Sequence, residues 1–139
     1  MTDIIAAVRK YLLLDATVAP LVNDRVYAGE LPKEQTPDMP RKAIVLRYAG
    51  GIEANTFVPI ARPRIDITAY GETYHEAGRV DRAAYTALKK LDRQNVNGVL
   101  LHGIAISGGP LMLKDPQTNW PYQWRSITVT ADERNIVEE

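Results

Sequence analysis

The feature that most constrains the fold is a change of hydrophobic period between residues 62 and 92. Over residues 62–70 apolar and polar side chains alternate, which is typical of a half-buried strand. After Thr73 the apolar residues recur at helical spacing, in a stripe formed by Ala77, Val80, Ala84, Ala87, Leu88 and Leu91. Thr73 and Glu76 form a capping-box pattern, so we expect a helix over residues 74–92. A strand followed at once by an amphipathic helix predicts a sheet with that helix across one face.

The remaining segments predict an N-terminal helix and further strands. Residues 3–14 are amphipathic with Thr2 as the expected cap, and Asp15 is expected to cap a short turn that ends at Val22. Strands are expected over residues 25–31, 43–49, 103–114 and 122–131, with turn signals at 50–51, 97–98 and 115–121. Residues 32–42 and 52–61 are expected to be loops. The expected fold class is α/β (α+β): a mainly antiparallel sheet of four to five strands, with one long helix and an N-terminal helix on one face.

The chain is expected to form a single domain over residues 1–139. A chain of 139 residues with 45% hydrophobic residues can bury a core without disulfides. Residues 132–139 are polar, four of them acidic, and are expected to form a flexible tail. No apolar run approaches the ~18 residues that span a bilayer, and no signal peptide is seen, so no membrane association is expected.

One face of the sheet is a candidate protein interface. If both helices cover the face with Ile65, Ile67, Ile127 and Val129, the opposite face carries Tyr70, Tyr122 and Trp124 among hydroxyl side chains. Aromatic residues interleaved with hydroxyls and arginine suit a protein–protein contact, although a solvated face has the same alternation. Arg62 and Arg64 either contact an anionic partner or lie on a solvated strand face. The candidate interface residues are therefore Arg62, Arg64, Tyr70 and Trp124.

The sequence has no pattern that predicts catalysis, a cofactor or a metal. Cysteine is absent, which excludes disulfides and thiolate ligands and favours synthesis in a reducing cytosol. His75 and His102 lack the neighbouring ligands or nucleophile that a zinc or catalytic site requires. The glycine pairs at 50–51 and 108–109 do not precede a helix as a phosphate-binding loop does, so a turn or bulge is expected. With 17 basic and 17 acidic residues, the chain also lacks the basic excess of a nucleic-acid-binding protein.

Three groups of segments, in order along the chain, resemble one protein family. The first is LDATVAPLV at residues 14–22 with DRVYAGELP at 24–32, and the second is RPRIDITAY at 62–70 with YHEA at 74–77. The third is DPQTNWP at 115–121, before the last expected strand. Together they resemble the small tail-completion and tail-terminator (neck) proteins of long-tailed bacteriophages and prophages. The loop at 32–42 is longer than the family pattern.

This resemblance implies a structural virion protein without catalytic residues. Its expected form is a homo-oligomeric ring, usually a hexamer, that caps the tail tube and joins it to the head. The implied partners are other copies of the chain, the tail tube protein and the head–tail connector protein. The implied location is the virion tail or neck, after synthesis in the bacterial host cytoplasm. DNA would pass through the ring without sequence-specific binding.

Two other classes of function are compatible with the sequence. A head-completion stopper or adaptor also forms a ring of small subunits, and sequence separates these neck proteins poorly from a terminator. A small cytosolic binding module or enzyme would instead need a pocket with converging polar groups.

We expect the purified protein to hold no stoichiometric metal and to show no turnover that depends on histidine, because the two histidines lack partners. Elemental analysis of protein prepared without added metal checks the first expectation. Bound zinc at one equivalent, or an activity lost in His75→Ala or His102→Ala, would contradict the prediction.

Overall fold

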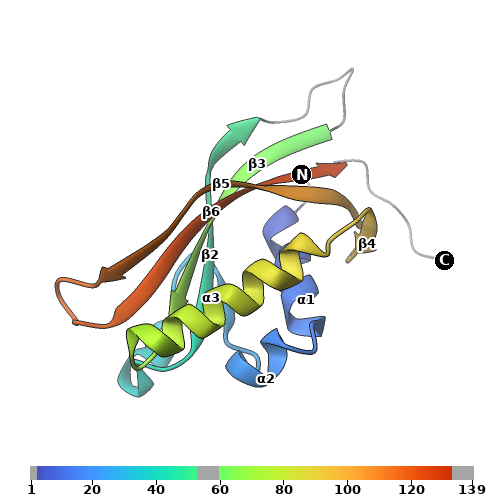
Figure 1. Cartoon of the computed structure of the whole chain (residues 1–139). Helices are drawn as coiled ribbons and strands as arrows, with labels where there is room; N and C mark the ends of the chain where they lie inside the picture. The colour runs from blue at the N-terminus through green and yellow to red at the C-terminus, as the bar shows by residue number, and fades with distance from the viewer. Residues whose placement is uncertain (1–2, 53–59, 133–139) are drawn as a thin grey trace.

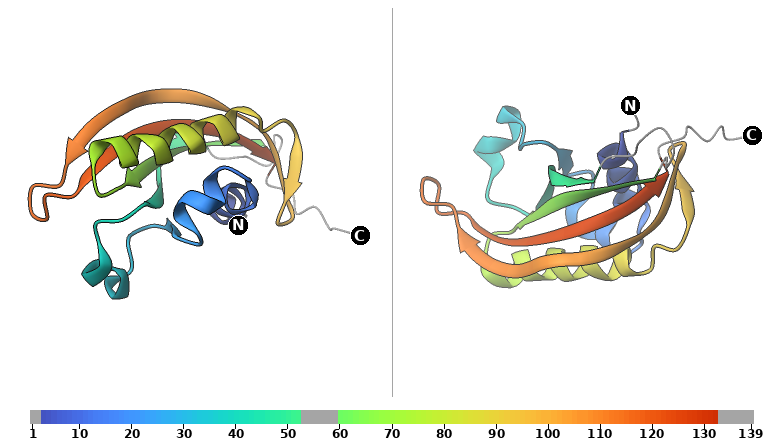
Figure 2. Two further views of the ribbon diagram at one scale, coloured as in Figure 1. Left: turned by 60° about the horizontal axis from the view of Figure 1, so that its bottom comes forward. Right: turned by 90° about the horizontal axis from the view of Figure 1, so that it is seen from above.

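The computed structural model describes residues 3–52 and 60–132 as an α+β domain in which a curved sheet wraps around helices on one face (Figures 1 and 2). The helices are α1 (Ile4–Leu14), α2 (Val18–Val22) and α3 (Tyr74–Lys89), with a 3₁₀ segment η1 (Lys33–Asp38). The strands are β1 (Val26–Ala28), β2 (Ala43–Ile52), β3 (Ile60–Tyr70), β4 (Gln94–Val96), β5 (Val99–Lys114) and β6 (Pro121–Asp132).

The sheet has six strands within the described residues, in the order β1-β2-β3-β6-β5-β4. β1 pairs with β2 in parallel, and all the other neighbours are antiparallel. The expected sheet of four to five strands therefore lacked β4. Besides the one long and the N-terminal helix that were expected, the structure has the short helix α2, where only a short turn was expected. β4 escaped detection because three residues cannot show a period. It forms because Asn97 and Gly98, at φ 54° and 78°, fold the chain back onto β5.

The glycine pair at 50–51 does not end β2, contrary to expectation. The strand continues to Ile52, with a shift of register between Tyr48 and Gly51. Gly50 and Gly51 have φ of 97° and 110°, and a Cβ on Gly51 would lie 2.5 Å from the Arg62 carbonyl oxygen. Glycine therefore lets β2 bulge and stay beside β3. Of the loop expected at 52–61, the ends belong to these strands and residues 53–59 lie outside the described part of the chain.

The N-terminal helix was predicted correctly, but its cap was not. The Asp3 side chain accepts a hydrogen bond from the Ala6 amide at 2.9 Å, whereas Thr2 lies outside the described residues. Asp15 acts as expected, because its Oδ1 accepts from the Thr17 and Val18 amides at 2.8 and 3.0 Å. The loop expected at 32–42 contains the η1 turn. Asp132, expected in the flexible tail, is a buried residue of β6, and residues 133–139 are not described.

The turn between β5 and β6 follows its sequence signals. Asp115 Oδ1 accepts hydrogen bonds from the Gln117 and Thr118 amides at 2.9 and 3.2 Å, which closes the start of the turn. Asn119 takes the left-handed conformation at φ 61°. The two long strands can therefore extend as a hairpin beyond the end of α3 that begins at Tyr74 (Figure 1).

Helix α3 is held across the sheet by the apolar stripe predicted from its sequence. Thr73 Oγ1 accepts a hydrogen bond from the Glu76 amide at 3.2 Å, which confirms the N-cap. All six residues of the stripe are buried, as are Ile65, Ile67, Ile127 and Val129 on the facing strands. α1 packs beside α3, where the Tyr11 hydroxyl donates to the Ala87 carbonyl at 2.6 Å. Both main helices thus cover one face of the sheet, as expected.

Leu88→Ala should lower the free energy of unfolding by about 2–5 kcal/mol, because Leu88 is fully buried between α3 and the sheet. Chemical denaturation followed by circular dichroism measures the change. Leu14→Ala is the matched control, since Leu14 is 69% exposed and its truncation should change stability by less than about 0.5 kcal/mol. Equal effects of the two substitutions would contradict burial of the stripe.

Candidate protein-protein interface

The face of the sheet opposite the helices carries the candidate residues, as the register of β3 and β6 shows. Tyr70 is opposite Tyr122, and Thr68 is opposite Trp124, so the aromatic side chains gather at one end of this face. The Tyr70 and Tyr122 rings lie 5.7 Å apart between centroids, and Trp120 meets Tyr70 edge-to-face at 6.2 Å. We call Tyr70, Trp120, Tyr122 and Trp124 the aromatic end.

The two candidate arginines lie on the same face but not at the aromatic end. Arg64 is opposite Thr128, and its Nε donates to Ser126 Oγ at 2.7 Å. Arg62 is exposed and is paired with Ile52 of β2. Arg64 and Tyr70 are six positions apart, about 20 Å along an extended strand. The four predicted residues therefore share a face without forming one cluster.

Sequence analysis missed the apolar side chains of the distal half of β5. Ile106, Leu111, Met112 and Leu113 belong to the few large hydrophobic residues that are exposed in the described part of the chain. Leu111 is opposite Trp124 and Leu113 is opposite Tyr122, so both enlarge the aromatic end. The signal was the run Leu-Met-Leu at 111–113 in a strand, which places apolar side chains on both faces. Exposed apolar side chains beside aromatic ones are typical of surfaces that contact other proteins.

The glycine pair at 108–109 shapes this surface by a bulge, one of the two outcomes expected. The register of β5 shifts between Ile106 and Gly108 and again before Leu111. Gly109 has φ 87°, and a Cβ on it would lie 2.6 Å from the Trp124 carbonyl oxygen. Each shift adds one residue to β5, so the two shifts cancel and Leu111 lies on the face that alternation from Ile106 gives it, the same side as Trp124.

Burial affects the titration of Tyr70 at the aromatic end. Burial raises the pKa of Tyr70 above its ordinary value, and the nearby Asp115 and Tyr122 raise it further, while Arg47 opposes them. Tyr70 therefore presents a neutral phenol at neutral pH. An aromatic surface with neutral polar tips can be desolvated in a contact at lower cost than a charged one.

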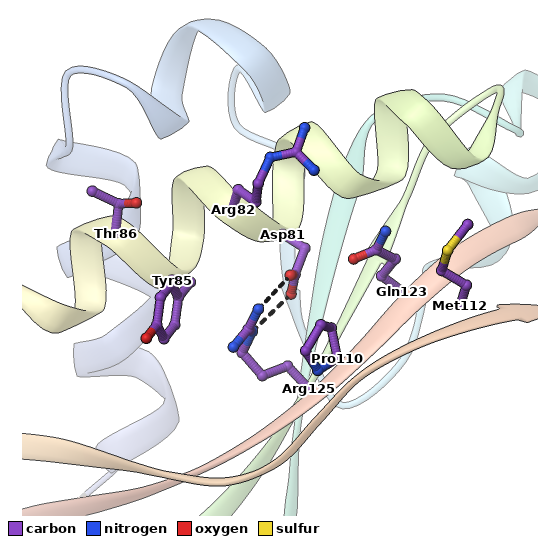
Figure 3. Close-up of a pocket in the computed structure, with 8 residues that line it drawn as sticks. All are labelled: Asp81, Arg82, Tyr85, Thr86, Pro110, Met112, Gln123 and Arg125. Atoms are coloured by element: carbon purple, nitrogen blue, oxygen red, sulfur yellow. Dashed lines mark hydrogen bonds and ion pairs between the residues drawn. The ribbon is translucent and has the colours of Figure 1, made fainter.

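A second feature lies on the helix side of the same hairpin. A hollow of about 560 Å³ separates α3, through Arg82, Tyr85 and Thr86, from Pro110 and Met112 of β5 (Figure 3). Its floor contains an ion pair in which Arg125 Nε and Nη2 donate to Asp81 at 3.1 and 2.8 Å.

The Arg125–Asp81 pair is structural by its geometry. Both side chains are buried, and the Arg125 guanidinium lies 4.2 Å from the centre of the Tyr85 ring. The two-point contact satisfies the carboxylate, so it offers no free general base. Sequence analysis did not find the pair, because Asp81 lies inside an otherwise ordinary helix. The available signal was Arg125 at an inward position of β6.

Neither histidine lines this hollow. His75 is exposed in the first turn of α3, and His102 is half-buried on β5, beyond the end of α3. Within residues 3–52 and 60–132, no three acidic or histidine side chains gather as a metal site would require. No helix of the described chain is long and apolar enough to cross a membrane.

The fold is shared with a known virion protein. No family model matches the sequence, and no curated protein sequence matches it. One chain of a structure described as the virion of a native gene transfer agent particle superimposes with a TM-score of 0.67 at 17% identity. The match covers 92% of this chain and 93% of that one. The gp17 protein of bacteriophage SPP1 gives a TM-score of 0.46 at 16% identity, over 96% of this chain and 90% of that chain. The first similarity shows that the whole fold recurs in a virion component.

Breaking the buried ion pair on one side should destabilise the fold. Arg125→Met leaves Asp81 buried without its partner, so we expect a loss of about 3–5 kcal/mol in the free energy of unfolding. The double variant Arg125→Met/Asp81→Leu removes both charges and should recover most of that loss. Denaturation of the wild type, the single variants Arg125→Met and Asp81→Leu, and the double variant completes a double-mutant cycle that measures the coupling. Additive effects of the two substitutions would contradict a coupled pair.

Proposed function

We propose that this chain is a structural protein of a phage-type virion, and specifically a ring-forming tail terminator. The observation that carries the proposal is the shared fold with a virion chain over nearly the full length of both proteins. The order of the sequence segments that resemble tail-completion proteins supports the same assignment. The protein would act by occupying a position in the particle, without a chemical reaction.

The surface of the domain suits such a role. The aromatic end and the exposed apolar residues of β5 offer a contact surface, while the ion pair in the hollow is already satisfied. The chain has zero formal net charge, so copies can pack closely without strong mutual repulsion. A contact of this type needs no cofactor.

The geometry of a closed ring explains how a terminator stops growth. Copies joined head-to-tail close into a ring when the rotation between neighbours divides the circle, as in the hexamer that the resemblance implies. One side of the ring would bind the last ring of the tail tube protein and block further addition. The other side would present a surface to the head–tail connector protein, with the lumen open to DNA.

Loss of the protein from the phage or prophage that encodes it should give tails of uncontrolled length, or tails unable to join heads. The reason is that no ring would stop polymerisation of the tube or connect it to the head. Electron microscopy of particles from a deletion strain measures tail length and attachment, and expression of the protein in trans is the control.

Two results would contradict the terminator role. Normal-length tails attached to heads would show that the protein is dispensable for both steps. Normal free tails beside heads that lose their DNA would favour a head-completion stopper or adaptor instead. Purified protein that remains monomeric and binds neither tails nor heads would favour a small binding module.

A further inference from the structure

Within the described residues, two edges of the sheet are uncovered along more than half of a strand. β4 pairs only with residues 99–101 of β5, and no strand of the described chain pairs with residues 103–114 on that side. At the opposite edge, β1 pairs only with Ile44, Val45 and Leu46 of β2. Residues 47–52 of β2 therefore form a second uncovered edge. We call these segments the β5 edge and the β2 edge.

The two edges lie at diagonally opposite corners of the sheet. Tyr70 of β3 is opposite both Ala43 of β2 and Tyr122 of β6, which is in turn opposite Leu113 of β5. The β5 edge is therefore at this end of the sheet. The β2 edge is at the other end, where Ile52 pairs with Arg62. Each side of the sheet therefore has a stepped outline, in which β1 projects at the end near Tyr70 and β4 projects at the opposite end.

Apolar side chains accompany both edges. Leu111 and Met112 on the β5 edge are 50% and 61% exposed, and Tyr48 on the β2 edge is 49% exposed. Proteins commonly protect an open edge with charge, proline or a bulge. The β5 edge has Pro110 and its bulge in the middle, but residues 111–113 carry no charge. Pro110 and the bulge thus limit main-chain hydrogen bonding with a partner strand to parts of the edge. The exposed apolar side chains would supply the rest of the contact.

The size of the β5 edge suits a stable contact between proteins. Residues 103–114 extend about 40 Å, and a strip about 10 Å wide gives roughly 400 Å² for the edge alone. A specific interface buries about 800 Å² on each partner. The adjoining aromatic end and the hollow beside Met112 can supply the remaining area.

We propose that a second copy of this chain covers the β5 edge with its β2 edge, an inference that rests on the proposed ring and identifies its subunit contact. β2 and β5 run in opposite directions within one sheet. A neighbour in the same orientation therefore brings its β2 antiparallel to β5. The contact joins two different surfaces, so it is heterologous, and an open assembly retains one free edge of each kind until the ring closes.

The stepped outline determines how the copies are offset. The two edges come side by side only when the neighbouring sheet is displaced along the strands. In a closed ring without axial rise, strands tilted to the ring axis accommodate that displacement, as the stagger of a barrel is accommodated by strand tilt. The projections β1 and β4 then lie above and below the shared edge.

The first experiment adds charge to the β5 edge. Leu111→Glu/Met112→Glu should raise the concentration for half-maximal self-association by at least about tenfold, because a charge would be buried in the contact. Light scattering coupled to size exclusion measures assembly, and circular dichroism melting checks that the domain stays folded. Leu14→Glu is the control, since Leu14 is 69% exposed on α1, away from both edges, and should leave assembly unchanged.

The second experiment uses the absence of cysteine in the chain. Leu113→Cys and Ala49→Cys place one thiol on each edge, at exposed positions. When the two single variants are mixed and oxidised, disulfide-linked heterodimers should predominate on non-reducing gels. The chain with both cysteines should give a ladder of linked subunits. Cross-linking of either single variant only with itself would overturn the heterologous contact.

The outcomes separate this inference from the proposed function. Rings that persist in Leu111→Glu/Met112→Glu, with no cross-linking between the two edges, overturn the subunit contact and leave the terminator role intact. A wild-type protein that forms no ring, alone or on tails, overturns both. Loss of rings in the edge variant, with cross-linked heterodimers, supports the contact.

Discussion

The buried ion pair between Asp81 and Arg125 sets the position of α3 on the sheet. Arg125 belongs to β6, which pairs with both β3 and β5, so the helix is tied to the middle of the sheet. A charge in this environment must keep its partner, which disfavours sliding of the helix by one turn. The hairpin of β5 and β6 extends past the first turn of α3 (Figure 1), and the hollow lies between α3 and β5 (Figure 3).

The local periodicity of the sequence was sufficient for β3 and α3, because each has a buried face longer than two periods. It was insufficient where the backbone alone decides the structure. β4 is too short to show a pattern, and the continuation of β2 past Gly50 depends on pairing with β3 at distant positions. The Asp81–Arg125 pair joins residues 44 positions apart, and no local signal specifies such a contact.

The candidate surface was predicted in part for the same reason. Alternation along β3 and β6 correctly placed Tyr70 and Trp124 on one face, since a strand's period determines its two sides. Arg62 and Arg64 lie far from Tyr70 and Trp124 because residues of an extended strand are spread along its length. The type of residue alone does not indicate this distance. Leu111 and Leu113 lie on this face because the two one-residue shifts of β5 beside Gly108 cancel, whereas either shift alone would exchange the faces of every later residue.

The bulge at Gly109 also limits how this protein can change during evolution. A side chain at that position would meet the backbone of the neighbouring strand at Trp124, so the base of the hairpin tolerates little variation. Beyond Pro110, exposed side chains have few neighbours within their own subunit and can be replaced without disturbing the core. Selection can therefore adjust the tip of the hairpin to a changed partner while the bulge preserves its direction. The hairpin thus has a base whose sequence is constrained and a tip whose sequence can vary.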